Sequence, residues 1–185
     1  MGILYGIGVG PGDSELLTVK AVRTIEKCDV IVAPSAQEDG ESIALETARE
    51  YIKEGTEVCI KHFPMGGKER LKKSLEAYEF IEARLREGKN VAFLTIGDPY
   101  VYSTYIHMLS HVEEHGFEVK TIPGITSFCA AASLANKTLV IGNENLLILP
   151  ASKVDTIRDE KFVVIMKVYK REEEVLNTLE EKGFK

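Results

Sequence analysis

The sequence predicts an α/β fold in which mainly parallel sheets are covered by helices, and it divides the chain into two such domains. Three observations lead to this prediction. Apolar runs of strand length alternate with helical patterns along almost the whole chain. Three of these runs end in turns rich in glycine or proline that lead into a helix. The length of 185 residues also allows a real core, because folding buries roughly 70% of the unfolded surface of such a chain.

Seven apolar runs have the length of a buried strand, and helical segments separate most of them. The strands are predicted at residues 3–9, 30–33, 58–60, 91–96, 119–122, 146–149 and 162–168. The helices are predicted at residues 17–28, 43–51, 71–85, 103–115, 126–133 and 171–182. Apolar side chains recur at every third or fourth position in the first three helices. Asp13 or Thr18 is expected to cap the first helix, and Gly88 is expected to end the third.

The boundary between the two domains is predicted near Gly116, where one helix ends and a new strand begins. Residues 1–116 would form an N-terminal α/β domain and residues 117–185 a C-terminal one. The last helix has Gly183 as its cap, and Phe184 resembles the start of a further strand. The C-terminal domain is therefore expected to be incomplete.

Composition limits the classes of partner. The chain has 23 basic and 29 acidic side chains and a net charge of -6, which argues against binding to nucleic acid or to an anionic membrane. Its cysteines are Cys28, Cys59 and Cys129, with no C-x-x-C pair, so neither a disulfide framework nor a zinc ribbon is expected. No apolar run approaches the ~20 residues of a membrane span, and no secretory leader precedes the first strand. A soluble, cytoplasmic protein with reduced, core-buried cysteines is expected.

The first glycine-rich turn covers residues 6–13, Gly-Ile-Gly-Val-Gly-Pro-Gly-Asp. A dinucleotide fingerprint would need a glycine where Pro11 stands and an acidic residue after the second strand, where Pro34 and Ser35 stand. Residues 66–69, Gly-Gly-Lys-Glu, lack the hydroxyl of a P-loop. The glycines therefore fit a tight turn as well as they fit contact with a ligand.

Two later turns resemble the first in position. Gly97-Asp98-Pro99 follows the apolar run 91–96, and Pro123-Gly124 follows the run 119–122. Ligands bind at the carboxyl ends of strands in open α/β sheets, and the hydroxyls of Thr126 and Ser127 would offer donors at a helix start. The alternatives are that Asp98 only braces its own loop and that Thr126 or Ser127 only caps its helix.

Two clusters of polar residues also invite a functional interpretation. His107, His111 and His115 recur every four residues, but the apolar residues of that helix are expected to turn all three toward solvent, so no metal site is predicted. A basic cluster consists of Lys61, His62, Lys68, Arg70, Lys72 and Lys73. Most of its lysines are expected on a solvated helix face, while Lys61 and His62 stand before a Pro-Met-Gly-Gly loop, residues 64–67, that could cover a ligand.

The three turns together carry a resemblance that covers the whole chain. Gly6-x-Gly8-x-Gly10-Pro11-Gly12 with Leu17-Thr18, then Gly97-Asp98-Pro99, then residues 123–127, Pro-Gly-Ile-Thr-Ser, resemble the tetrapyrrole methylase family of S-adenosylmethionine-dependent enzymes. Residues 102–105 and 122–130 resemble, within that family, the precorrin-2 C20-methyltransferases, above all those that act on cobalt-precorrin-2 (cobalt-factor II) in anaerobic cobalamin biosynthesis.

The resemblance implies a homodimer of two α/β domains that binds S-adenosylmethionine in the cleft between them and the tetrapyrrole in a trough of the first domain. The cofactor contacts that it implies are Pro11, Ile96, Gly97, Asp98, Val101, Tyr102, Thr126, Ser127 and Met166. No resident metal is implied, because any cobalt would arrive inside the macrocycle. Since family members continue for several more strands, weak cofactor binding is a further expectation.

The implied reaction is an in-line displacement in which a macrocycle carbon takes the sulfonium methyl group and S-adenosylhomocysteine leaves. Alignment in a dry cleft can supply most of the acceleration, so no catalytic triad is expected. Asp98 and Tyr102 are the candidates for catalytic roles, and Tyr105 is expected to pack in the core. The alternatives are another tetrapyrrole position (uroporphyrinogen III or a later precorrin), the protein methylation carried out by diphthine synthase, and a non-catalytic fragment that only binds ligand.

Overall fold

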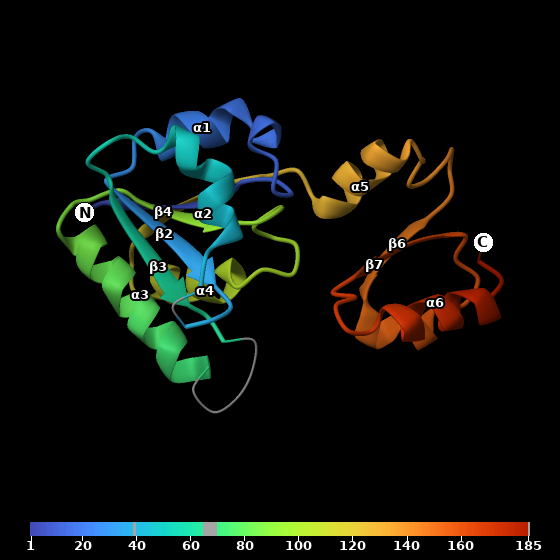
Figure 1. The fold of residues 1–185 in the computed structure, drawn as a ribbon. Coiled ribbons are helices and arrows are strands. Elements are labelled where there is room, and N and C mark those ends of the chain that lie inside the picture. The colour runs from blue at the N-terminus through green and yellow to red at the C-terminus, as the bar shows by residue number, and fades with distance from the viewer. Residues whose placement is uncertain (39, 65–69, 185) are drawn as a thin grey trace. The chain divides into compact units, whose positions relative to one another are not determined.

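The structure is a computed structural model that describes residues 1–38, 40–64 and 70–184. It divides the chain into two compact units, Met1–Ser127 and Phe128–Lys185, each described here by itself (Figure 1). Among the described residues, no helix is both long and apolar enough to cross a membrane.

The first unit is built on a sheet of five parallel strands in the order β3-β2-β4-β1-β5. The strands are β1 Ile3–Gly8, β2 Val30–Ser35, β3 Glu57–His62, β4 Val91–Thr95 and β5 Glu118–Ile122. Each lies within two residues of its prediction. Because β1 pairs with both β4 and β5, the carboxyl ends of these three strands lie next to one another at one edge of the sheet.

Helices cover both faces of this sheet (Figure 1). The helices of one face are α1 Val19–Ile25 and α2 Ile43–Ala48, and those of the other are α3 Arg70–Arg86 and α4 Tyr105–Glu114. Short 3-10 turns occupy Ser14–Leu16 and Arg49–Tyr51. Thr18 caps α1, where its hydroxyl accepts a hydrogen bond from the Ala21 amide, and Asp13 caps the preceding 3-10 turn. Of the two alternatives that the sequence offered for the cap of the first helix, Thr18 is the one that caps α1.

The strands separate two apolar cores because successive side chains alternate between faces. Leu4, Val32 and Phe93 pack with α3 and α4, whereas Ile7 and Ile31 pack with α1 and α2. All five side chains are fully buried, and each contributes about 1.5–3 kcal/mol to folding through the apolar surface removed from water. The sheet is thereby held rigidly beneath the loops at its carboxyl edge.

The second unit is smaller. Its two strands, β6 Leu146–Pro150 and β7 Phe162–Met166, pair in parallel, and the 3-10 segment Ala151–Thr156 and the helix α6 Glu172–Glu181 pack on a core that includes Leu149 and Val175. The helix α5, Ser127–Ala135, begins at the last residue of the first unit and has no buried residue.

Several details differ from the sequence prediction. The compact units meet after Ser127 rather than near Gly116, because β5 hydrogen-bonds to β1 and so belongs to the first sheet. Leu71 lies on the predicted apolar face of α3 but is exposed. Cys28 is buried as expected, whereas Cys129 is exposed on α5, where no buried side chain gives it a core to join.

Candidate functional site

Three loops leave the adjacent carboxyl ends of β1, β4 and β5, and they are the three turns that the sequence singled out. We name them loop 1 (residues 9–13), loop 2 (residues 96–104) and loop 3 (residues 123–126). Strand pairing alone would bring their first residues together. Direct contacts between the loops then hold them in one constellation.

Loop 1 and loop 2 are joined by backbone hydrogen bonds between two glycines. The Gly97 amide donates to the Gly10 carbonyl at 2.7 Å, and the Gly10 amide donates to the Gly97 carbonyl at 3.3 Å. Both residues have positive φ, +75° and +72°, which glycine adopts without the steric cost that a side chain imposes. The glycines therefore let two parallel strands end in a short antiparallel bridge.

Loop 2 and loop 3 are joined by the side chain of Asp98. Its Oδ2 accepts a hydrogen bond from the Gly124 amide at 3.0 Å, and its Oδ1 accepts one from the Tyr100 amide at 2.9 Å. The carboxylate is partly buried. Because an ionised carboxylate can accept about four hydrogen bonds, these two contacts leave lone pairs for a ligand. Bracing and ligand contact, which the sequence posed as alternatives, are therefore chemically compatible.

The loops pack so closely that side chains would not fit. A Cβ on Gly124 would lie 2.2 Å from the Gly97 carbonyl oxygen, and a Cβ on Gly8 would lie 2.6 Å from the Gly124 nitrogen. Both obstacles are backbone atoms, so no side chain can rotate away. Gly8 and Gly124 are thus required for loop packing.

A hollow of about 320 Å³ is lined by residues of loop 2 and by residues 34–36 at the carboxyl end of β2. The lining residues from loop 2 include Ile96, Val101 and Tyr102. Ser35 and Phe63 are among the lining residues from other parts of the first unit. Tyr102 adopts φ +50°, a left-handed conformation that is uncommon for a bulky residue and that is enriched at functional sites. Three of the five predicted cofactor residues of loop 2 therefore line this concave surface, whereas Gly97 and Asp98 are not among its lining residues.

Thr95 also lines this hollow, and the sequence analysis missed it. The residue is only 6% exposed, and its Oγ1 has no hydrogen-bond partner within the part of the chain that the structure describes. A buried hydroxyl without a partner costs about 1–3 kcal/mol, so a ligand that hydrogen-bonds to it would recover that energy. The signal in the sequence is a lone hydroxyl near the end of an otherwise apolar strand.

The remaining predicted cofactor residues lie in three places. Pro11 follows Gly10 in loop 1 and is half-buried, and Thr126 and Ser127 stand at the start of α5. Met166 is the last residue of β7 in the second unit. The contacts above bring the loop 2 residues together with the loops that carry Pro11, Thr126 and Ser127. The role of each residue as a ligand contact stays a prediction.

Tyr105, at the start of α4, has the packing role that was expected. Its ring is fully buried, and its hydroxyl shares a hydrogen bond of 2.6 Å with the Oγ1 of Thr121 on β5. Burial raises the pKa of Tyr105 to about 12, so the phenol stays protonated at neutral pH. A Cβ on Gly6 would lie 2.1 Å from this ring. Packing against Tyr105 therefore explains why the first position of the motif is glycine.

The basic cluster is largely engaged in surface contacts. The Lys61 ammonium lies 4.0 Å from the centroid of the Phe80 ring, Lys73 pairs with Glu38 at 2.5 Å, and Lys72 lies 4.0 Å from Glu76. These contacts agree with a mainly solvated helix face. Lys68, the side chain of Arg70 and the loop residues 65–67 lie outside the described part of the chain.

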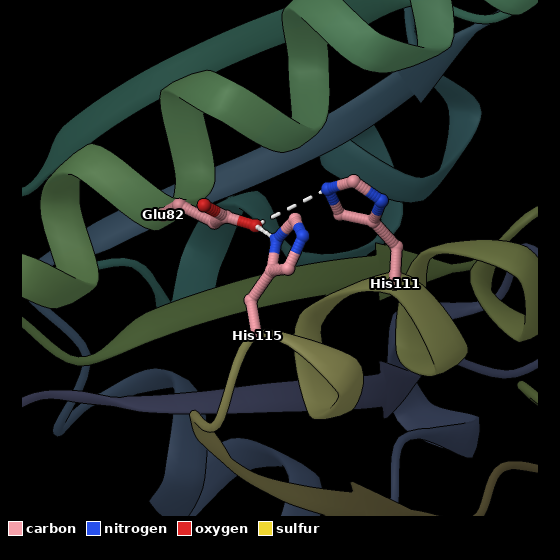
Figure 2. Close-up of side chains that lie close together, drawn as sticks. All are labelled: Glu82, His111 and His115. Atoms are coloured by element: carbon pink, nitrogen blue, oxygen red, sulfur yellow. Dashed lines mark hydrogen bonds and ion pairs between the residues drawn. The ribbon is translucent and has the colours of Figure 1, made fainter.

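The histidines of α4 do not all face solvent. His107 does, but His111 and His115 point toward the carboxylate of Glu82 on α3 (Figure 2). That expectation was wrong for His111, because α3 packs against this side of α4 and brings a buried acid with it, whereas His115 is exposed as expected and also contacts this acid. Glu82 sits between apolar positions of its helix, and an acidic residue on a buried face is the signal that could have revealed the cluster.

The chain is similar to known proteins in sequence and in fold. A sequence model of the family described as Tetrapyrrole (Corrin/Porphyrin) Methylases matches residues 3–185. The chain is 41% identical over 167 residues to a probable cobalt-precorrin-2 C(20)-methyltransferase of Methanocaldococcus jannaschii, covering 89% of this chain and 71% of that protein. It is 34% identical over 177 residues to the cobalt-precorrin-2 C(20)-methyltransferase of Salmonella typhimurium, covering 92% and 74%.

A solved structure shares the fold. The uroporphyrin-III C-methyl transferase of Thermus thermophilus, complexed with S-adenyl homocysteine, superposes with a TM-score of 0.74 and is 19% identical, with all of this chain and 78% of that one covered.

Proposed function

Because the chain belongs to the tetrapyrrole (corrin/porphyrin) methylase family, we propose that it transfers a methyl group from S-adenosylmethionine to C20 of cobalt-precorrin-2 (cobalt-factor II). The observation that carries this proposal is the identity of 41% and 34% to two cobalt-precorrin-2 C20-methyltransferases over about nine-tenths of the chain. The place of this reaction is anaerobic cobalamin biosynthesis, as the resemblance implies.

The described residues fit a bound methyl donor. The hollow beside loop 2 is lined mainly by apolar side chains, and the buried Thr95 hydroxyl in it has no partner among the described residues. Asp98 retains lone pairs after its two backbone hydrogen bonds. These groups suit a ligand that carries both an apolar body and hydrogen-bond donors.

When bound, S-adenosylmethionine supplies an electrophilic methyl group on a sulfonium. The protein's task is then alignment, since positive charge disperses as the methyl group moves and little acid or base help is needed. We assign that task to the three loops together. Their relative positions are maintained by the Asp98 side chain and by the backbone bridge between Gly10 and Gly97. Tyr102, held in a left-handed conformation at the hollow, would exclude water from it.

We propose as cofactor contacts Pro11, Ile96, Gly97, Asp98, Val101, Tyr102, Thr126, Ser127 and Met166, and we add Thr95. We also propose a cytoplasmic homodimer. Cys28, Cys59 and Cys129 are all free in the structure. Light scattering on the purified chain tests the dimer, and a monomeric mass would contradict it.

Enzyme assay tests the reaction itself. The purified chain is incubated anaerobically with S-adenosylmethionine and cobalt-sirohydrochlorin, the cobalt-factor II substrate, and in parallel with uroporphyrinogen III. We expect a product heavier by one methyl group only with the cobalt substrate. Methylation of uroporphyrinogen III alone would refute the choice of substrate and favour a different position on the macrocycle.

A binding module without turnover is the alternative of another class. The chain spans 71% and 74% of the length of the two relatives. Calorimetry with S-adenosylhomocysteine, combined with the enzyme assay above, separates the two functions. Binding together with turnover supports the enzyme, and binding without turnover of any tetrapyrrole supports the module.

A further inference from the structure

A cluster of three metal-ligand side chains lies between α3 and α4, on the face of the sheet covered by these two helices (Figure 2). Glu82 comes from α3, His111 comes from the last turn of α4, and His115 is the C-cap residue of α4. One ligand atom from each of the three residues lies within 4.8 Å of the other two. We propose that Glu82, His111 and His115 form a binding site for a divalent transition-metal ion of the zinc class.

The distances suit such an ion. Ligand atoms bound tetrahedrally to zinc at ~2.0–2.1 Å are separated from one another by about 3.3 Å. The His111 Nε2 lies 3.2 Å from the Glu82 Oε1, which is close to that separation. The His115 Nδ1 is hydrogen-bonded to the same oxygen and would move outward slightly as the ion replaces this contact. Two imidazoles and one carboxylate favour zinc over magnesium or calcium, which prefer oxygen ligands.

The helix spacing builds the histidine pair. Residues four apart on a helix lie on the same face, and His111 and His115 accordingly have ring centroids 4.3 Å apart. Paired histidines at this spacing are a known way for one helix to supply two zinc ligands. The third ligand must come from another element, and Glu82 of α3 meets this need.

Outer contacts orient the ligands, as second-shell partners do in metal sites. The Arg86 guanidinium binds the other carboxylate oxygen of Glu82, Oε2, at 2.6 Å, which leaves Oε1 directed at the histidines. The Tyr78 ring lies 4.9 Å from the His111 ring and limits its rotation. The Glu82 side chain is only 6% exposed, so its carboxylate is held in place before any ion arrives.

The site is open on one side. The His115 side chain is 48% exposed and that of His111 is 25% exposed, so an ion can enter from solvent and keep water in its remaining positions. Binding displaces any proton that a histidine shares with Glu82, because the metal takes the nitrogen lone pair. The ion would tie α3 more firmly to α4, since the two helices already share an apolar core and the contacts of Glu82 with the two histidines.

The test is a zinc titration of the full chain without a histidine tag, in metal-free buffer, followed by calorimetry. We expect one ion per chain, and we expect zinc to raise the unfolding temperature. His115→Ala should weaken the site by about tenfold or more, and Glu82→Gln should do the same. His107→Ala and Cys129→Ser are matched controls that remove an exposed ligand outside the cluster and should leave the affinity unchanged.

Two results would overturn the proposal. One is the absence of stoichiometric zinc binding to the unmodified chain. The other is unchanged affinity in His115→Ala, a half-exposed position whose truncation leaves the core intact, as its circular dichroism and metal-free unfolding temperature would verify. In either case the cluster is only a hydrogen-bonded clamp between two helices. The outcome is independent of the methyltransferase assay.

Discussion

The carboxylate of Asp98 accepts a hydrogen bond of 3.0 Å from the Gly124 amide, and this single contact joins two loops that leave different strands of the sheet. The same carboxylate accepts the Tyr100 amide at 2.9 Å. Asp98 therefore controls both the conformation of its own loop and the position of the next one. Since Gly124 also packs against Gly8 and the Gly97 carbonyl, a change at Asp98 reaches all three loops.

Replacing Asp98 should weaken cofactor binding in graded steps. Asp98→Ala removes both acceptors, and hydrogen bonds to a charged group are worth about 1.5–3 kcal/mol each. Asp98→Asn keeps one acceptor oxygen and should lose less. We expect the Kd for S-adenosylhomocysteine to rise by about tenfold or more in the alanine variant, with the asparagine variant in between. Calorimetry measures both, and an alanine variant that binds like the original chain would contradict the assignment.

Thr95→Val should separate stability from ligand binding. In the free protein the Thr95 hydroxyl is buried without a partner among the described residues, so its loss should leave thermal stability unchanged or raised. Binding of S-adenosylhomocysteine should become weaker if the ligand uses this hydroxyl.

Thr121→Val is the contrasting variant for stability, because the Thr121 hydroxyl is hydrogen-bonded to Tyr105 and also accepts a hydrogen bond from the Tyr100 hydroxyl. That variant should lose about 0.5–1.5 kcal/mol of stability for each of these bonds. Thermal unfolding with and without ligand gives both quantities, and a destabilised Thr95→Val variant with unchanged affinity would show that the hydroxyl is not a ligand contact.

The three cysteines should differ in reactivity. Burial, with a smaller contribution from the nearby Asp29 charge, raises the pKa of Cys28 to about 12, so almost no reactive thiolate exists at pH 8. Cys129 is exposed. A chromogenic disulfide reagent should therefore modify Cys129 quickly and Cys28 only after unfolding. Cys129→Ser should remove the fast phase, and a fast phase that persists in this variant would count against the assignment.

Glu57 should give the first unit a modest pH dependence. The hydrogen bond from Arg84, at 2.7 Å, is the largest cause that lowers the pKa of Glu57. A carboxylate with a lowered pKa stabilises the fold above its unfolded pKa of ~4.3, and this stability is lost as the pH falls through the folded pKa. Because the pair is partly exposed, its contribution is below about 1 kcal/mol.

Glu57→Gln should therefore lower the midpoint temperature of thermal unfolding at pH 7. It should have no effect on this temperature at a pH below the folded pKa of Glu57. Glu54→Gln, at an exposed position of the preceding turn, is the control. An equal loss in the two variants at pH 7 would argue against a specific role for the Arg84 contact.

Much of the fold followed from local patterns. The alternation of apolar runs and helical spacing predicted the parallel strands, and Thr18 was one of the two residues proposed as the cap of the first helix, because capping depends on residues only two or three positions apart. The convergence of the three loops was also predictable, since parallel strands end at one edge. The boundary near Gly116 was misplaced because strand pairing between β5 and β1 is not a local property.

The amino-acid sequence by itself determined the class of fold, the three turns and the family, because these depend on periodicity, on residues that permit tight turns and on motifs read in order. Only the tertiary structure decided what the side chains meet. It placed His111 and His115 against Glu82, left the Thr95 hydroxyl buried without a partner among the described residues, and used both oxygens of Asp98 on backbone amides. Such contacts join residues far apart in the chain, and packing between elements sets them.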